Sequence, residues 1–284
     1  MAGVEGYRGA RMAIGRRKAL LYRRILSDRG WSLRDETTLL DLGCGDGALV
    51  WAFREMGVDA QGCDLELGSS APHLRQIQPR PYQLPFASRS FDVVVSLAVM
   101  EHVQNWTETI DEVARVLKPD GVTLHVFPAR FRPLEAHVHV PLAGVLQHAW
   151  WLKLWARAGV RNRFQRHMAS ADVVLDNEVY LRDQTAYPTR RQVATAFARC
   201  FAEVRFCDRE MICHASDRVR SLPTPVRRCL GAIAPLYGTF GHRSLLAFGP
   251  RDPGRSTERL TGTRFAGFMR IADDGRSRAS PGLG

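Results

Sequence analysis

Apolar runs and helical patterns alternate along residues 37–128 of this chain. Residues 39–42 form a short apolar run with one acid, and Phe91–Val99 is almost continuously apolar, as in strands covered on both faces. Val58–Cys63 predicts a second short strand, and Ala48–Met56 before it has the periodicity of a helix. Strands that alternate with helices indicate a parallel sheet, which binds ligands at the carboxyl ends of its strands.

The flanking regions predict a helical cap, an insertion and a second helical half. Residues 11–30 have the pattern of an amphipathic helix, with Leu20, Leu21 and Ile25 on its apolar side. We expect this helix to precede the first strand and to cover the ligand site. Two further helices are predicted at Val145–Ala158 and Thr189–Cys200, and two further strands at Val204–His214 and Ser244–Phe248. Between these strands, residues 216–240 form a basic amphipathic stretch that Pro223 and Pro225 interrupt.

Three alternating glycines follow the first strand directly. Gly43, Gly45 and Gly47 have the spacing G-x-G-x-G, and Asp41 stands two residues before the first of them. Glycine permits positive φ and lets a ligand lie directly on the backbone, while the start of a helix offers unpaired N–H groups. Folds that bind dinucleotides use G-x-G-x-x-G instead. The carboxylate of Asp41 suits a cationic ligand group better than a pyrophosphate.

A second acid follows the second strand. Asp64 lies about twenty residues beyond the glycine turn, where nucleotide-binding α/β folds hold ribose hydroxyls with a carboxylate. We therefore expect Asp64 to bind a ribose, with Leu65 beside it. A solvated acid at a strand end is the alternative, and Glu66 is a weaker candidate for the same role.

Four sequence segments occur in a characteristic order. They are the glycine turn with Asp41, the acid Asp64, the stretch from Leu84-Pro85-Phe86 through Phe91-Asp92-Val93-Val94 to Glu101-His102-Val103, and the turn Leu117-Lys118-Pro119-Asp120-Gly121 before a predicted strand Val122–Phe127. Together they resemble the motifs of class I S-adenosylmethionine-dependent methyltransferases, in particular their small-molecule branch. The resemblance implies a Rossmann-like, doubly wound α/β sheet of about seven strands, mostly parallel with an antiparallel last strand, plus a helical lid insertion.

The resemblance also implies S-adenosylmethionine as the cofactor. Asp41 would contact its methionine amine, the glycines would lie beneath it and Asp64 would hold its ribose. The expected cofactor-binding residues are Asp41, Gly43, Cys44, Gly45, Gly47, Asp64, Leu65, Gln83, Leu84 and Ser96. The family often has an Asp, four residues before Leu-Pro-Phe, that binds the adenine amino group, but Arg80 stands there in this chain. We therefore expect adenine to be recognised by Gln83 or by backbone groups around Leu84.

Composition bears on the compartment of the protein. A chain of 284 residues can form one domain with additions, and none of its apolar runs approaches the length of a membrane span. The N-terminus lacks a signal-peptide core, so the sequence predicts a cytoplasmic protein. The six cysteines have no C-x-x-C spacing and indicate neither a zinc site nor a disulfide framework; Cys44 is expected to be a small packing residue.

The charge of the chain leaves its partners open. The net charge is +11, and all but three of the 40 basic residues are arginines scattered along the chain. A nucleic-acid surface and ordinary solvated faces both account for this excess. The basic amphipathic stretch 216–240 could contact an anionic membrane, or could pack on the sheet with its arginines outward.

Three histidines are the candidate catalytic residues. Methyl transfer from a sulfonium needs a base only if the nucleophile carries a proton, and it requires no metal, so the sequence predicts none. His102 follows the fourth strand, and His137 and His139 lie beyond the fifth. In an extended segment residues two apart point to the same side, so both could converge on an acceptor hydroxyl. Alternatives are structural histidines bonded to the backbone, or a metal site with Glu135 as the nearby carboxylate.

The sequence therefore predicts methyl transfer to a small-molecule, glycan or lipid-linked acceptor, at oxygen. The segment Phe131–Leu142 resembles lids of methyltransferases from bacterial envelope polysaccharide and lipid-linked sugar pathways. An RNA methyltransferase that uses the basic surface and a non-catalytic binding protein are the alternatives; intact Asp41 and Asp64 argue against the second. The expected division is an N-terminal cap 1–36, a cofactor-binding half 37–128, a lid 129–188, a C-terminal half 189–250 and a disordered tail 251–284.

Overall fold

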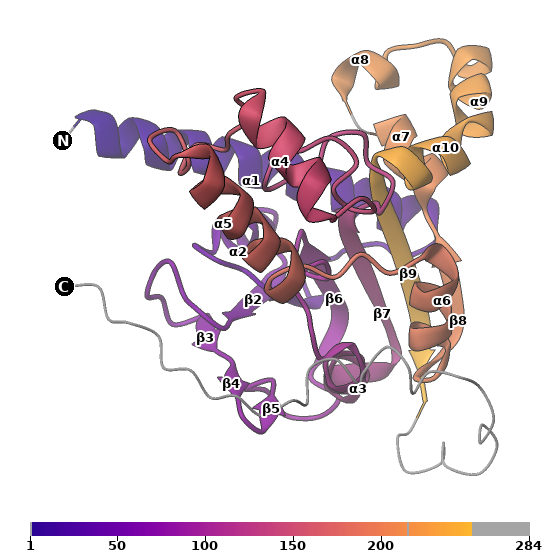
Figure 1. Ribbon diagram of the computed structural model, residues 1–284. Helices are drawn as coiled ribbons and strands as arrows, with labels where there is room; N and C mark the ends of the chain where they lie inside the picture. Colours follow the sequence, from indigo (N-terminus) through magenta and orange to yellow (C-terminus); the bar gives the residue numbers. More distant parts are fainter. Residues whose placement is uncertain (1, 215, 252–284) are drawn as a thin grey trace.

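The computed structural model describes residues 2–214 and 216–251, with side chains described at all of these except 2–8, 217, 218 and 228. Its centre is a twisted sheet of seven strands (Figure 1). Their order across the sheet is β3 (Leu74–Gln76), β2 (Asp59–Asp64), β1 (Thr38–Leu42), β6 (Phe91–Leu97), β7 (Leu117–Pro128), β9 (His242–Pro250) and β8 (Phe201–Phe206). The strands from β3 to β7 pair in parallel, and β9 runs antiparallel to both of its neighbours. The predicted sheet, with its antiparallel last strand, is confirmed.

Two layers of helices cover the sheet (Figure 1). One face packs against α1 (Ala2–Asp28), α2 (Ala48–Glu55) and α7 (Asp208–His214). The other face packs against α3 (Trp106–Val116) and α6 (Arg190–Ala198), the latter opened by a capping box at Thr189 and Gln192. Along β6 the side chains alternate between these layers, Val93 and Val95 facing α1 and α2, Val94 facing α3 and α6.

An insertion between β7 and α6 forms its own small unit. The helices α4 (Ala149–Arg157) and α5 (Ser170–Asp183) pack together over a separate apolar core that includes Val138 and Val140 (Figure 1). Between α7 and β9 lie α8 (Asp217–Arg220), α9 (Thr224–Ala232) and α10 (Ala234–Phe240). Pro223 is the N-cap residue of α9, so the predicted interruption of the basic stretch is present.

The register of the sheet gathers the ends of its central strands. Leu42 of β1 pairs with Cys63 of β2 on one side and with Ser96 of β6 on the other. The glycine turn, Asp64 and the loop after β6 therefore leave the sheet at one edge. This is the carboxyl edge, where parallel α/β sheets bind their ligands.

Four sequence predictions require correction. The second half of the predicted strand Val204–His214 is the helix α7, because Cys207 and Met211, one helical turn apart, both pack into the core against α1. The aromatic helix begins at Ala149 rather than Val145. On α1, Leu20 is 38% exposed, so it does not lie on the buried side of the helix where the pattern placed it. The predicted turn Leu117–Gly121 is part of β7. Leu117 pairs with Phe91 of β6, and the register shifts before the next pair, Val93 with Val122. The predicted disorder of 251–284 lies outside the described residues, apart from Arg251, which donates to the Cys200 carbonyl.

Candidate active site

The glycine turn has the geometry that its spacing predicts. Gly43, Gly45 and Gly47 have φ values of 76°, 55° and 76°, a region that favours glycine. Gly47 is the N-cap residue of α2. A Cβ on Gly43 would collide with Val99, whereas a Cβ on Gly45 would meet nothing within 4 Å. The turn is therefore closed beneath Gly43 and open above Gly45, where a ligand can approach the backbone.

Two carboxylates flank this turn. Asp41 is 2% exposed, and burial raises its pKa to about 8, assisted by the charges of Asp64 and Asp46 and opposed by that of Lys18. Asp64, at the end of β2, accepts a hydrogen bond from the Gly45 amide at 2.7 Å. The structure thus brings Asp41, Asp64 and the glycines together, and the negative charge there favours a cationic ligand group.

Cys44 and Leu65 contribute differently. Cys44 is buried against Gly62, and burial strongly raises the pKa of its thiol. Its amide donates to the Cys63 carbonyl, so the residue closes the turn as a packing residue. Leu65 is 50% exposed beside Asp64, and its carbonyl accepts from the Gln76 side chain at 3.0 Å.

An open hollow of about 360 Å³ lies beyond the end of β3. Its lining residues are Gln76, Gln78, Gln83, Leu84, Pro85 and Phe86. The Leu84 amide donates to Glu112 at 2.8 Å, and the Leu84 carbonyl accepts from Arg115 at 3.1 Å. Arg80 is exposed at the turn between β4 (Gln78–Pro79) and β5 (Tyr82–Gln83). The backbone amide and carbonyl of Leu84 are thus engaged within the protein, and recognition of adenine by Gln83 or by backbone groups around Leu84 stays a prediction.

Ser96 does not face the candidate cofactor site. Ser96 is two residues beyond Val94 on β6, so its side chain lies on the same face of the sheet, toward α3 and α6. Its hydroxyl is 2.7 Å from Nδ1 of His125. His125 is fully buried, its Nε2 is 2.7 Å from the Thr123 hydroxyl, and burial lowers its pKa to about 3. The Ser96 carbonyl accepts from the Tyr22 hydroxyl of α1 at 2.5 Å. The Ser96 side chain is therefore engaged on the α3–α6 side of the sheet, and the prediction that Ser96 contacts the cofactor stays a prediction for its backbone.

A second cluster occupies the loop after β6. Glu101 is fully buried, burial raises its pKa to about 7, and neither carboxylate oxygen accepts a hydrogen bond from any described residue. Nε2 of His102 lies 4.0 Å from Glu101. The rings of His102 and His137 are in edge contact, with centroids 4.7 Å apart. One ligand atom from each of the three residues lies within 4.8 Å of the others. This carboxylate was missed in the sequence.

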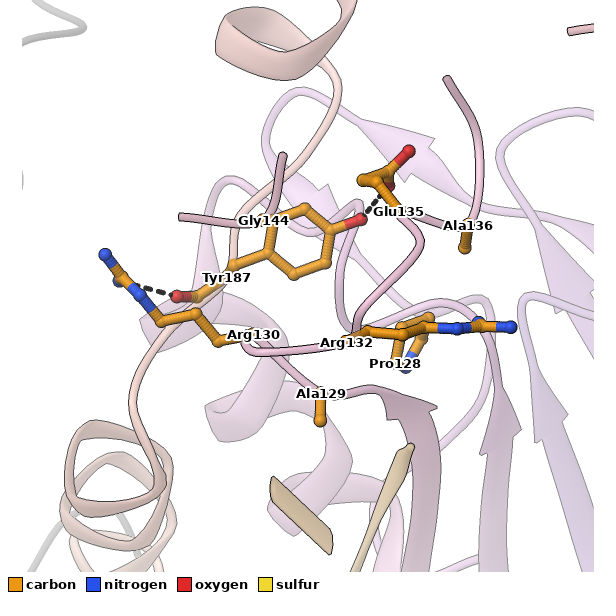
Figure 2. A pocket seen from close by; sticks show the side chains of 8 residues that line it. All are labelled: Pro128, Ala129, Arg130, Arg132, Glu135, Ala136, Gly144 and Tyr187. Atoms are coloured by element: carbon orange, nitrogen blue, oxygen red, sulfur yellow. Dashed lines mark hydrogen bonds between the residues drawn. The ribbon is translucent and has the colours of Figure 1, made fainter. Parts of the chain in front are cut away.

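Glu135 is hydrogen-bonded both to Tyr187 (Figure 2) and to His137. The Tyr187 hydroxyl donates to Glu135, and Arg130 donates to the Tyr187 carbonyl at 2.9 Å. Glu135 also accepts from Nδ1 and the amide of His137, and from the Val138 amide. Burial opposes ionisation, but these donors and the His137 charge lower the pKa of Glu135 to about 2. The crevice that Glu135 and Tyr187 line has essentially no free volume, so it is packing rather than a ligand pocket.

His139 lies outside this cluster. Residues 136–138 form a turn, and His139 itself is exposed with a φ of 59°. The extended geometry that the predicted convergence of His137 and His139 assumed is therefore absent here. His102 replaces His139 as the neighbour of His137.

The two clusters share one edge of the sheet. Val99 packs against Gly43, and the charges of both Asp41 and Glu101 add to the burial that raises the pKa of Tyr22. A sheet of this order with a glycine turn after β1 and an acid after β2 is the arrangement of class I S-adenosylmethionine-dependent methyltransferases.

Comparison with known proteins identifies the family. A family model described as a methyltransferase domain matches residues 13–172, more than half of the chain, so the chain belongs to this methyltransferase family. It is 32% identical over 94 residues to a ubiquinone biosynthesis O-methyltransferase of Agrobacterium fabrum, covering 30% of this chain and 38% of that protein. It is 32% identical over 99 residues to a probable S-adenosylmethionine-dependent methyltransferase of Mycolicibacterium smegmatis, covering 32% and 38%.

These matches span about two fifths of the length of the curated relatives. Among solved structures, geranyl diphosphate C-methyltransferase from Streptomyces coelicolor has 16% identity and a TM-score of 0.41, over 80% of this chain and 74% of that one.

No helix of the described residues is long and apolar enough to cross a membrane.

Proposed function

We propose that this protein transfers the methyl group of S-adenosylmethionine to a hydroxyl oxygen of a small-molecule, glycan or lipid-linked acceptor. The observation that carries the proposal is the pairing of two clusters at one sheet edge. The glycine turn with Asp41 and Asp64 suits the cofactor, and the cluster of Glu101, His102 and His137 faces the side from which an acceptor would approach.

The cofactor would lie across the open face of the glycine turn. Asp41 would bind its amino group and Asp64 its ribose hydroxyls, while Gly45 allows close approach of the cofactor to the backbone. The adenine would occupy the hollow beside Gln83. Binding in this order directs the sulfonium toward the loop after β6.

Transfer at oxygen is favoured by the proton acceptors beside that loop. An in-line displacement is assisted mainly by proximity, but a hydroxyl nucleophile must lose its proton. His102 and His137 are 36% and 24% exposed at the side chain, so both rings are accessible from solvent. The match to ubiquinone biosynthesis O-methyltransferases supports an oxygen acceptor.

An apolar surface on the lid supports an acceptor with apolar character. Trp150 and Leu154 of α4 and Leu175 and Val179 of α5 are 40–62% exposed. Larger exposed apolar patches on a protein mark sites where it binds a ligand, another protein or a membrane. We assign the lid to acceptor binding for this reason.

A peripheral contact with an anionic membrane surface would present a lipid-linked acceptor. Val226 of α9, Ile233 between the helices, and Leu236 and Phe240 of α10 are all 43–59% exposed. Arg209 is exposed on α7 and lies against Gly231 of α9. Apolar side chains beside basic ones are the composition of interfacial helices.

The first test is calorimetric titration with S-adenosylhomocysteine, the product form of the cofactor. Wild-type protein should bind it, and Asp64→Ala should bind roughly tenfold to a hundredfold more weakly, because charged hydrogen bonds to the ribose are lost. Asp64→Asn keeps an oxygen for the Gly45 amide and separates loss of charge from loss of the turn. Asp59→Ala, an exposed acid at the other end of β2, is the matched control. Absence of binding in the wild type would reject the proposal.

A further inference from the structure

Hydrogen bonds fix the protonation of both histidines in the cluster at the loop after β6. Nδ1 of His102 lies 2.8 Å from the Gln184 carbonyl, which can only accept, so this nitrogen carries the proton. Nδ1 of His137 lies 2.9 Å from the carboxylate of Glu135 and donates to it. In each neutral ring the remaining nitrogen, Nε2, therefore presents a bare lone pair.

The same cluster contains a carboxylate without a donor. Both oxygens of Glu101 are buried, and no described residue donates a hydrogen bond to either. Buried polar atoms are normally satisfied, because leaving one unpaired costs about 1–3 kcal/mol and more for a charge. Beside two neutral imidazoles, Glu101 is thus a third acceptor in the cluster.

Two imidazoles and one carboxylate that each bring a ligand atom within 4.8 Å of the others form a ligand set for a metal. Ligating histidines almost always donate their other N–H to a carbonyl or a carboxylate, as His102 and His137 do. Atoms bound to one zinc ion lie roughly 3.4 Å apart, given bonds of about 2.1 Å. Ligand atoms within 4.8 Å of one another need only a small closure to reach that geometry.

We infer that Glu101, His102 and His137 bind a divalent transition-metal cation of the zinc type. The two nitrogen ligands favour such an ion over magnesium, which prefers oxygen ligands and octahedral geometry. The side chains of His102 and His137 are partly exposed, which gives the ion access. The expectation that the protein needs no metal, made from the chemistry of methyl transfer, is replaced by this inference.

Three protein ligands leave a coordination position for the acceptor; this step rests on the proposed function. A hydroxyl bound to the metal becomes more acidic, as water does on zinc. Its proton passes to the oxygen of Glu101 that does not ligate the ion. The acceptor oxygen then forms a bond to the methyl carbon while the carbon–sulfur bond breaks, and that electron pair returns to sulfur as neutral S-adenosylhomocysteine.

The test is titration of tag-free, chelator-treated protein with zinc sulfate. Wild-type protein should bind one zinc ion per chain, and the ion should raise its melting temperature. Glu101→Gln and His102→Gln should each weaken zinc binding more than roughly tenfold. His167→Gln, which changes an exposed lid histidine outside the cluster, should bind zinc like the wild type.

Two controls separate the possible failures. S-adenosylhomocysteine titrated into Glu101→Gln should bind as to the wild type, which shows that the variant is folded and tests the proposed function independently. Cobalt substituted for zinc should give visible bands without thiolate charge transfer. A thiolate band, zinc binding that is equal in all four proteins, no zinc binding at all, or tighter binding of magnesium than of zinc would each overturn the inference.

Discussion

At the scale of single residues, burial determines what each carboxylate can do. Asp41, Glu101 and Glu135 are all at most 2% exposed, yet they differ in their donors. Glu135 is surrounded by N–H and O–H groups and its pKa falls to about 2, whereas burial raises the pKa of Asp41 to about 8. Glu135 is a structural anchor of the lid, and Asp41 is a buried acid whose ionised form a cationic ligand group would favour.

The first residue-scale prediction concerns Asp41→Asn. In the unfolded chain an Asp has a pKa of about 3.9, so between about pH 4 and pH 8 the folded protein keeps a proton that the unfolded chain releases. The contribution of Asp41 to stability is therefore complete below pH 4 and is lost as the pH rises toward 8. Asn has no proton to release, so the variant does not lose this stability. The free energy of unfolding of the variant minus that of the wild type should therefore rise by a few kcal/mol from pH 5 to pH 8.

Urea unfolding at both pH values measures this difference, with Asp59→Asn as the exposed control. The Asp41→Asn variant should also lose affinity for S-adenosylhomocysteine. A stability difference that does not change with pH would contradict the assigned pKa of Asp41.

The second residue-scale prediction concerns Ser96→Ala. The change removes the hydroxyl beside Nδ1 of buried His125, and an unsatisfied buried group costs about 1–3 kcal/mol of stability. Because the Ser96 side chain faces the α3–α6 layer, affinity for S-adenosylhomocysteine should stay at the wild-type value. Unfolding and calorimetric titration of the same preparation check both parts; a large loss of affinity would return Ser96 to the cofactor site.

The sequence predicted the residues whose role follows from spacing. Gly43, Gly45 and Gly47 were identified because alternation after a strand leaves few other backbone geometries. The side on which the Ser96 side chain lies follows from the alternation along β6, since Val94 is two residues away on the same face. Glu101 could not be recognised, because only the folded structure shows that none of the described residues donates to its carboxylate.

At the scale of elements, α1 joins the cap to the cofactor turn. Arg11 donates to Asp46 at 2.6 Å, and Tyr22 donates to the Ser96 carbonyl. A Cβ on Gly15 would overlap the Ala48 carbonyl at the start of α2, so the two helices touch backbone to backbone there. The notion that this helix covers the ligand site is consistent with these contacts.

Gly15→Ala is the element-scale prediction. The new methyl group should push α1 away from α2, lowering stability by about 1–3 kcal/mol and weakening S-adenosylhomocysteine binding. Gly9→Ala makes the same chemical change in the same helix with nothing within 4 Å, and should stabilise the protein by about 0.5–1 kcal/mol. Equal effects of the two substitutions would show that α1 does not depend on this crossing.

Local pattern predicted most elements, and tertiary packing decided the exceptions. Most of the apolar run Phe91–Val99 forms β6, which ends at Leu97, before Ala98 with its φ of 54°. The stretch after Phe206 has apolar residues at both strand and helix spacing, and burial of Cys207 with Met211 selects the helix. The sequence alone carries no measure of that burial.

At the scale of the whole molecule, the net charge of +11 supplies attraction without specificity. Charge alone would draw the protein to RNA and to anionic lipid alike. The proposed membrane contact rests on the exposed apolar side chains around α9 and α10, because they would gain free energy in a bilayer interface and not on a phosphate backbone.

Vesicle binding tests this proposal directly. The protein should co-sediment with vesicles of anionic phospholipid more than with neutral ones, and Leu236→Asp should reduce that binding several-fold, since it removes apolar area and adds repulsion. Leu175→Asp is the matched control, because Leu175 is similarly exposed, at 62% against 59%, but lies on the lid helix α5. If the control loses binding instead, the lid faces the membrane. If neither does, the attraction is electrostatic only, and added salt should abolish it within the Debye screening expected for exposed charges.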